Sequence, residues 1–232
     1  MQLVRKRVIS AALAALLALL AVAGIAISAP DGDRESVARL VLTTEEADKS
    51  TGAESLVRYA NPPSSDQAVR KIVTTFERGT AFDDSLPRRC QASDEEIEQE
   101  GTDACPNASR VGGGVFRGEL GGARVAADVT LYNAKDEVIV ISEVRGVDFA
   151  VFQRAPRGKR KLTIEIRGPV RELELLKSRI EIEKIGVGGK GYLTTPRSCP
   201  SSGEWTNKQR FVYRDGAEST ERVTSLCRDA FK

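Results

Sequence analysis

The side chains that most often perform catalysis near neutral pH are missing from this sequence or lack their usual neighbours. The chain of 232 residues has no histidine, which excludes Ser-His-Asp and Cys-His mechanisms and histidine-bound zinc. The S-x-x-K, K-T-G and G-x-S-x-G patterns of serine nucleophiles do not occur. The 33 acidic residues leave carboxylate chemistry open, but no spacing singles out a pair. We therefore expect no catalytic residue, no cofactor and no metal site.

One phosphate-binding motif matches by letter only. Gly186–Gly191 satisfies G-x-G-x-x-G and follows an expected strand. The motif binds a pyrophosphate only where a helix begins directly after it. Tyr192–Pro196 follows here and cannot begin such a helix, so we do not expect a dinucleotide site.

The four cysteines indicate disulfides. Cys90, Cys105, Cys199 and Cys227 form an even set without the C-x-x-C spacing of a zinc site. Three connectivities are possible. We favour Cys90–Cys105 with Cys199–Cys227 because each pair closes a short loop, which contributes roughly 3 kcal/mol for the first and slightly more for the second.

The N-terminus indicates export. Arg5–Arg7 form a positive segment, and the uncharged apolar run Val8–Ile27 follows. This order is typical of a signal peptide over residues 1–28, with a mature start at Ala29. The run of 20 residues is also long enough to remain as a membrane anchor. Both alternatives place the remainder outside the cytoplasm, in the extracellular space or at the cell surface, where disulfides persist.

The net charge of the exported part of the chain limits the classes of partner that we expect. Without the three N-terminal cations, 32 basic residues face 33 acidic ones, a formal charge of −1. A near-neutral domain gives no electrostatic reason to expect nucleic acid. We expect an unknown envelope or extracellular ligand, and membrane contact only through an uncleaved N-terminal segment. A local basic cluster is interpreted as a solvated hairpin turn, with anionic lipid or envelope polymer as its alternative partner (Arg154, Arg157, Lys159, Arg160, Lys161).

Most of the chain carries strand patterns. After a mobile leader at residues 29–35, we expect one β domain over residues 36–228. Its clearest strand places Leu162, Ile164 and Ile166 on one face and polar residues on the other. The run Val138–Ile141 favours a strand that is covered on both faces. Further strands are expected over 37–43, 69–77, 125–131, 180–183, 211–213 and 220–226.

Turn and capping residues complete the predicted fold. Asp215–Gly216 favours a type I′ hairpin turn. Ser93 and Glu96 predict a capping box for a short acidic helix that ends at Gly101. The acidic residues there lack the spacing of a calcium loop. The segment 169–179 is either helical or irregular. The predicted fold class is all-β, a sandwich or barrel-like domain with one short helix in the Cys90–Cys105 loop and two disulfides.

Several motifs resemble those of one family. The N-terminal pattern LP-x-x-C…CP-x-[AS]-x-x-VG-x-G is found in Leu86–Cys90 and Cys105–Gly114, and the C-terminal pattern CP…W…F-x-Y-x-DG…C extends from Cys199 to Cys227. Together they resemble a group of uncharacterised secreted proteins of high-GC Gram-positive bacteria. The resemblance spans roughly Phe76 to Cys227 and implies the same cysteine pairing. It brings no established activity.

The expected function is that of a secreted or envelope-attached, non-catalytic β domain with a binding or structural role. The alternative is a carboxylate-dependent extracellular hydrolase, which would need a cleft holding two acids with shifted pKa values. A third hypothesis is a carrier with an apolar cavity between its sheets. Because charged residues alternate with apolar ones along the strands, we expect Glu165, Arg167, Glu181 and Glu183 to be exposed.

Overall fold

The computed structural model describes residues 36–59, 68–147, 149–167, 171–187 and 190–228. They belong to one compact unit that extends from Asp33 to Lys232. The predicted signal peptide (1–28) and leader (29–35) lie outside the described residues. In the described ranges, no helix has the length and apolar character to cross a membrane.

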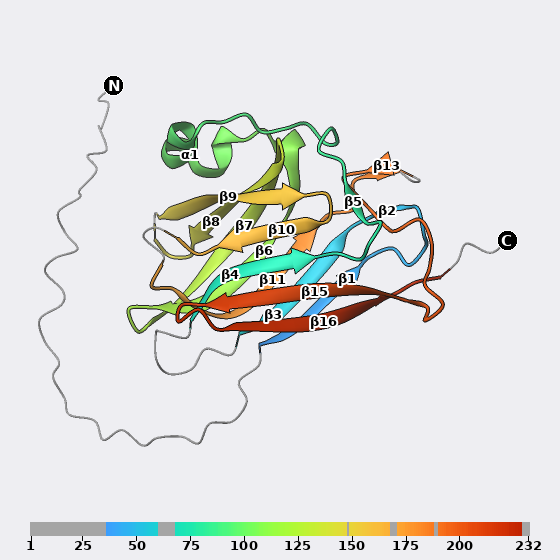
Figure 1. Cartoon of the computed structure of the whole chain (residues 1–232). Coiled ribbons are helices and arrows are strands. Elements are labelled where there is room, and N and C mark those ends of the chain that lie inside the picture. Colours follow the sequence, from blue (N-terminus) through green and yellow to red (C-terminus); the bar gives the residue numbers. More distant parts are fainter. Residues whose placement is uncertain (1–35, 60–67, 148, 168–170, 188–189, 229–232) are drawn as a thin grey trace, which may run out of the picture. The chain divides into compact units, whose positions relative to one another are not determined.

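A single antiparallel sheet of eleven strands forms most of the unit (Figure 1). In spatial order its strands are β1 (Val37–Leu42), β3 (Ala53–Arg58), β11 (Glu174–Ile182), β6 (Arg110–Leu120), β7 (Ala123–Ala134), β8 (Glu137–Val144), β9 (Ala150–Gly158), β10 (Lys161–Glu165), β4 (Val69–Thr75), β15 (Glu204–Tyr213) and β16 (Glu218–Leu226). The predicted all-β class is confirmed.

Short elements complete the unit. One small sheet comprises β2 (Ser50–Thr51), β14 (Leu193–Thr194) and β5 (Ala81–Phe82), and another comprises β12 (Gly186–Val187) and β13 (Lys190–Gly191). The helices are α1 (Asp94–Glu100), η2 (Gly101–Ala104) and η3 (Asn107–Ser109). The described residues directly after Gly191 include strand β14 and no helix, as expected from Tyr192–Pro196.

The two edge strands of the large sheet meet through one serine. The Ser225 hydroxyl of β16 accepts the Leu42 N–H of β1 at 3.0 Å and lies 3.3 Å from the Leu40 carbonyl oxygen. A parallel bridge between Glu46 and Arg228 extends this contact. The sheet therefore curls until its edges touch, which makes the unit barrel-like.

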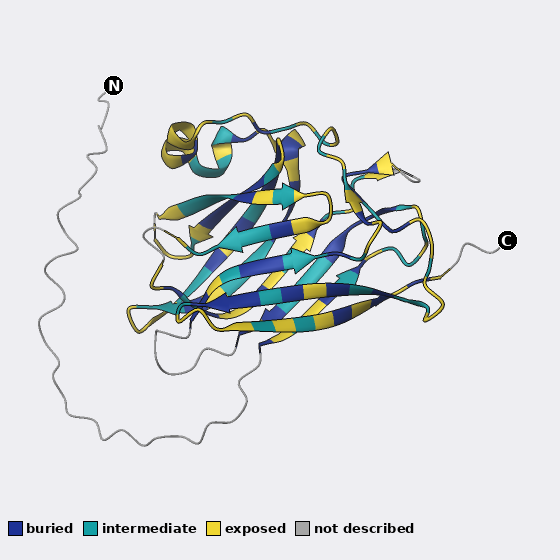
Figure 2. Cartoon of the chain, in the orientation of Figure 1, coloured by how far each residue is buried: buried dark blue, intermediate teal, exposed yellow. Residues whose placement is uncertain are grey.

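Alternation along β8 explains how both faces of this strand are covered. Val138 and Val140 belong to the main core inside the curled sheet, while Ile139 and Ile141 pack on the other face with Ile97 of α1. All four β8 residues are buried, and Figure 2 shows how buried and less buried stretches alternate along the strands of the sheet. The prediction of a strand covered on both faces is confirmed.

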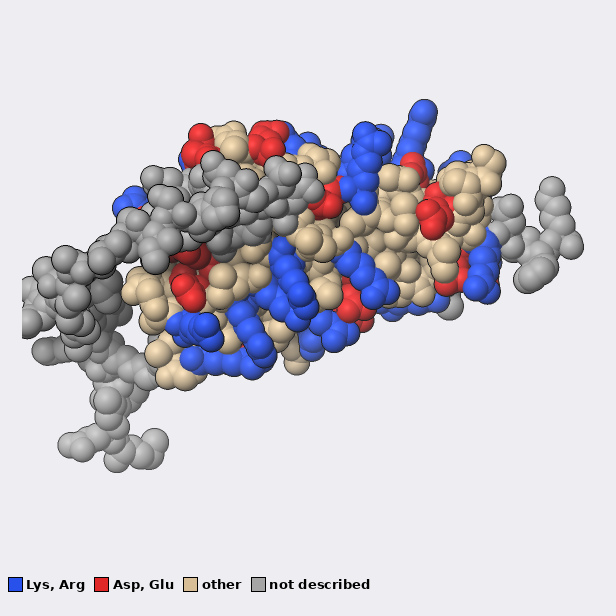
Figure 3. All heavy atoms as spheres, turned by 90° about the horizontal axis from the view of Figure 1, so that it is seen from below, with Lys and Arg blue, Asp and Glu red and all other residues tan. Residues whose placement is uncertain are grey.

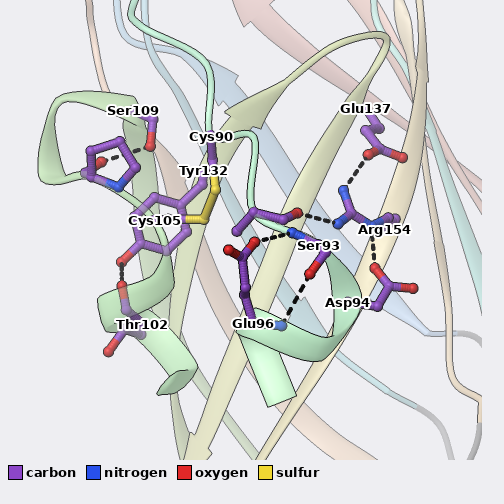
Figure 4. Close-up of a disulfide and its surroundings, with 12 residues drawn as sticks. Cys90, Ser93, Asp94, Glu96, Thr102, Cys105, Ser109, Tyr132, Glu137 and Arg154 are labelled. Carbon is purple, nitrogen blue, oxygen red and sulfur yellow. Dashed lines mark hydrogen bonds and ion pairs between the residues drawn. A yellow bond between two sulfur atoms is a disulfide. The ribbon is translucent and has the colours of Figure 1, made fainter. Parts of the chain in front are cut away.

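The predicted helix and its capping box are present (Figure 4). The Ser93 hydroxyl accepts the Glu96 N–H, and the Glu96 carboxylate accepts the Ser93 N–H. The helix lies within the loop closed by Cys90 and Cys105. Both predicted disulfides form, with Cα–Cα distances of 5.2 Å for Cys90–Cys105 and 5.6 Å for Cys199–Cys227.

The prediction of a type I′ turn at Asp215–Gly216 was wrong. Only Gly216 has a positive φ, 88°, whereas a type I′ turn needs two such residues. Four residues separate β15 from β16, and the Gly216 N–H reaches the Tyr213 carbonyl. The longer turn needs a left-handed residue only at the glycine.

Candidate functional site

An apolar cavity lies inside the curled sheet. Its volume is about 390 Å³, and apolar atoms form most of its surface. Strands from opposite walls contribute to it, including Phe116 of β6, Val140 of β8 and Ile164 of β10. The other apolar lining residues are Ile72, Val129, Phe149, Ala150, Val151, Phe152, Ile166, Leu173, Leu175 and Ile180.

The lining of the cavity includes the stretch where β9 and β10 no longer pair, with the exposed residues Phe149, Ala150 and Arg167. These strands pair only at their hairpin end, through Lys161–Gly158 and Leu162–Arg157. Residues 149–153 of one strand and 164–167 of the other line the cavity beyond that point. We call this parted stretch the β9–β10 seam.

Proline accounts for the end of the pairing. The Arg157 N–H donates to the Asp136 carbonyl on the β8 side, so residue 156 directs its backbone toward β10 by the alternation of an antiparallel ladder. Pro156 has no N–H to donate there. The sequence thus removes a hydrogen bond at the point where the ladder stops. Pro156 lies within β9, and the hairpin turn predicted for the basic cluster falls at residues 159–160.

A side chain bridges the seam. Gln153 points inward with Ala155, because the intervening Arg154 lies on the outer face. Its Oε1 accepts the Glu165 backbone N–H at 3.2 Å. The Glu165 N–H therefore donates to a side chain, whereas in a regular β9–β10 ladder it would donate to the β9 backbone.

Few polar groups reach into the cavity. Ser142 is only 8% exposed and lines the cavity, and within the described ranges its hydroxyl has no hydrogen-bond partner. Ser178 and Tyr59 satisfy each other through a bond of 2.8 Å between their hydroxyl oxygens. Burial raises the pKa of Tyr59 to about 12, so its phenol stays neutral at physiological pH. An uncharged ligand with at most a few polar atoms matches this surface.

Charged residues at the seam are paired. Glu165 lies 2.7 Å from Lys71 and also contacts Arg167. The hydrogen bond from Lys71 is the main cause of the lowered pKa of Glu165. Arg167 and Glu181 are exposed as predicted, but Glu165 and Glu183 are half-buried. For Glu165 the reason is that Lys71, from the adjacent strand, covers its carboxylate.

The predicted solvated basic cluster was only partly correct. Lys159, Arg160 and Lys161 are exposed at the hairpin. The Arg157 side chain is only 6% exposed, pairs with Asp84 at 3.1 Å and lies over the Phe82 ring. Arg154 is ion-paired to Asp94 and Glu137, as Figure 4 shows. Through these ion pairs, Arg154 and Arg157 hold the segments that contain Asp94 and Asp84 against β9.

Elsewhere on the surface, basic and acidic side chains are interspersed on the face that Figure 3 shows. Pairs such as Arg179–Glu54 join strands across the outer side of the sheet. Among the described residues, no group of three or more acidic or cysteine side chains is arranged to hold a metal.

The four predicted disulfide residues lie away from the cavity. Cys90 and Cys105 pack with Ile97 beneath α1. Cys227 packs in the main core with Trp205, whose indole N–H donates to the Ser198 carbonyl at 3.1 Å. Sequence analysis predicted the disulfides but assigned no binding role to any residue of the seam. Pro156 inside an otherwise strand-like run was the signal that marked it.

Comparisons with known proteins give little more. No protein-family model matches the chain, and no curated protein sequence matches it. Among solved structures, the crystal structure of BcpA, the major pilin subunit of Bacillus cereus, matches with 10% identity and a TM-score of 0.34. The match covers 83% of this chain and 40% of the pilin subunit, so the chain spans less than half of that protein's length.

Proposed function

We propose that this protein is an exported, non-catalytic β domain that binds an apolar ligand, or the apolar part of one, in the cavity behind the β9–β10 seam. The unfilled apolar volume carries the proposal. Protein interiors normally leave few voids larger than a water molecule. A cavity of about 390 Å³ lies instead within the usual range of ligand pockets, about 300–1,000 Å³.

Its chemistry favours an uncharged or weakly polar ligand. An apolar cavity of about 150 Å³ is enough to bind benzene, and this one is more than twice as large. Ser142 offers one hydroxyl for which a ligand oxygen or nitrogen is a suitable partner. The hydrophobic effect supplies most of the affinity.

The ionised state of Glu165 supports a non-catalytic role. Among the residues that the structure describes, Glu165 and Glu98 are the acids that line the cavity. Glu98 is exposed, and the lowered pKa of Glu165 suits a permanent ion pair better than proton transfer. We prefer binding to the hydrolase alternative for this reason.

Other features support the proposed location of the protein and its proposed family. Two disulfides support an extracellular or cell-surface site, since the cytoplasm keeps thiols reduced. On its motifs, we place the chain with the uncharacterised secreted proteins of high-GC Gram-positive bacteria.

The test is a titration with N-phenyl-1-naphthylamine, an uncharged probe that fluoresces in apolar surroundings. We expect saturable binding by the wild-type protein. Val151→Trp places a large side chain in the cavity and should weaken binding by at least about tenfold, or 1.4 kcal/mol. Val147→Trp is the matched control because Val147 is 59% exposed and does not line the cavity. Equal probe affinity in the two variants would contradict the proposal.

A further inference from the structure

The seam has two strand edges that face each other. Directly before β9, the carbonyl of Phe149 accepts the Val144 N–H, so the odd-numbered residues of β9 direct their backbone toward β8. Ala150, Phe152 and Arg154 therefore direct theirs toward the seam. On β10 the Ile166 N–H donates to the Arg70 carbonyl of the β4 side, which leaves Thr163 and Glu165 facing the seam.

These edges have a strand partner on one side only. β9 pairs with β8 over Ala150–Pro156, and β10 pairs with β4 over its full length. In the described part of the chain, β9 and β10 form no backbone pair with each other beyond Leu162–Arg157. Edge strands of this kind accept an added strand.

We propose that the seam binds an extended polypeptide segment that adds to β9 as a strand and places alternate apolar side chains in the cavity. The inference rests on the proposed function and specifies its ligand. Successive side chains of a strand point to opposite faces. One set would reach the apolar lining, and the other would lie outside near Glu165 and Arg167.

The backbone groups distinguish a peptide from a lipid chain. An acyl chain fills apolar volume but offers no donors or acceptors to Ala150, Phe152 and Arg154. A peptide offers both at the spacing of the ladder. Gln153 already supplies a side-chain amide oxygen to one seam donor, which shows that the seam accepts an amide group.

β10 itself shows which sequence suits β9. The segment Lys161–Arg167, which contains β10, alternates Leu162, Ile164 and Ile166 with polar residues. A capped, fluorescently labelled peptide of this sequence is therefore the probe. A second peptide carries N-methyl groups on the amides equivalent to Thr163 and Glu165, which removes the donors that face β9 and keeps every side chain.

We expect the unmodified peptide to raise fluorescence anisotropy saturably with the full-length protein, and the methylated one to bind at least about tenfold more weakly. Gln153→Ala frees the bridged donor and should strengthen peptide binding severalfold. Gln91→Ala, at an exposed position outside the seam, is the control and should leave affinity unchanged.

Three results would overturn the inference. Equal affinity for both peptides would mean that side-chain burial alone drives binding. If N-phenyl-1-naphthylamine binds and neither peptide does, strand addition is wrong and the proposed function stands. If neither the dye nor the peptide binds, both fail.

Discussion

The side-chain oxygen of Gln153 lies 3.2 Å from the backbone nitrogen of Glu165, where two neighbouring strands of one sheet no longer pair. A side chain thus takes the place of a main-chain acceptor. Gln153 lines the cavity, and Pro156, three residues further along β9, has no backbone hydrogen to donate. The opening is therefore encoded in the sequence.

Pro156→Ala tests this origin of the seam. The new amide can donate to the Thr163 carbonyl and extend the β9–β10 ladder by one pair. We expect slower hydrogen exchange at residues 163–165 and a slower association rate for N-phenyl-1-naphthylamine. Exchange identical to that of the wild type would show that another feature keeps the strands apart.

Two serines that line the cavity should respond oppositely to alanine. Ser142→Ala removes a cavity-lining hydroxyl without a partner among the described residues, so the free energy of unfolding should rise or stay equal. Ser178→Ala leaves the Tyr59 hydroxyl unpaired and should cost about 1–3 kcal/mol. Urea denaturation of both variants measures the difference. A larger loss for Ser142→Ala would contradict the assigned geometry.

The two disulfides should stabilise the fold without controlling the cavity. Replacing both cysteines of either pair by serine should lower the unfolding free energy by about 3 kcal/mol, and slightly more for the longer Cys199–Cys227 loop. Only that second variant should shift the emission of Trp205, which belongs to the same core cluster as Cys227. Probe affinity measured under folding conditions should not change in either. A lost binding site would show that the disulfides shape the cavity.

Acid should weaken the attachment of the loop that contains Asp84. Burial acts to raise the pKa of this carboxyl, but hydrogen bonds from the Asp136 N–H and Arg89, with the nearby Arg157 charge, lower it overall. A carboxyl with a lowered folded-state pKa stabilises the fold above its unfolded pKa, about 3.9, and this contribution is lost as pH falls through the folded value.

The expected result is a stability loss on acidification that is smaller in Asp84→Asn than in the wild type. Asp103→Asn, at an exposed position, serves as the control and should follow the wild-type profile. Chemical denaturation from pH 7 to pH 2 measures this, and parallel curves for all three proteins would rule out a role for Asp84.

Sequence patterns predicted those parts of the fold in which local chemistry and burial agree. Val138–Ile141 and the alternation of Leu162 with Ile164 gave two strands, and Ser93 with Glu96 gave the helix. β6 was missed because its glycines carry no pattern. A Cβ at Gly114 would collide with the Arg179 carbonyl, so close approach of β11 requires glycine there.

The cavity could not be predicted from the sequence because it is a property of distant strands. Phe116, Val140 and Ile164 each read as ordinary core residues, and only the curled sheet shows that they do not fill the space between them. The alternation of polar and apolar residues also predicted that Glu165 is exposed. This prediction was wrong because the Lys71 side chain, on the neighbouring strand, covers the Glu165 carboxylate.

Methyl NMR spectra recorded during a titration with N-phenyl-1-naphthylamine test the central claim most directly. We expect saturable shifts of the methyl signals of Val140, Val151 and Ile164, three residues that line the cavity. The methyl signals of Val37, which is 65% exposed, should stay in place. Shifts confined to exposed methyl groups, or no saturable shift at the three cavity residues, would contradict it.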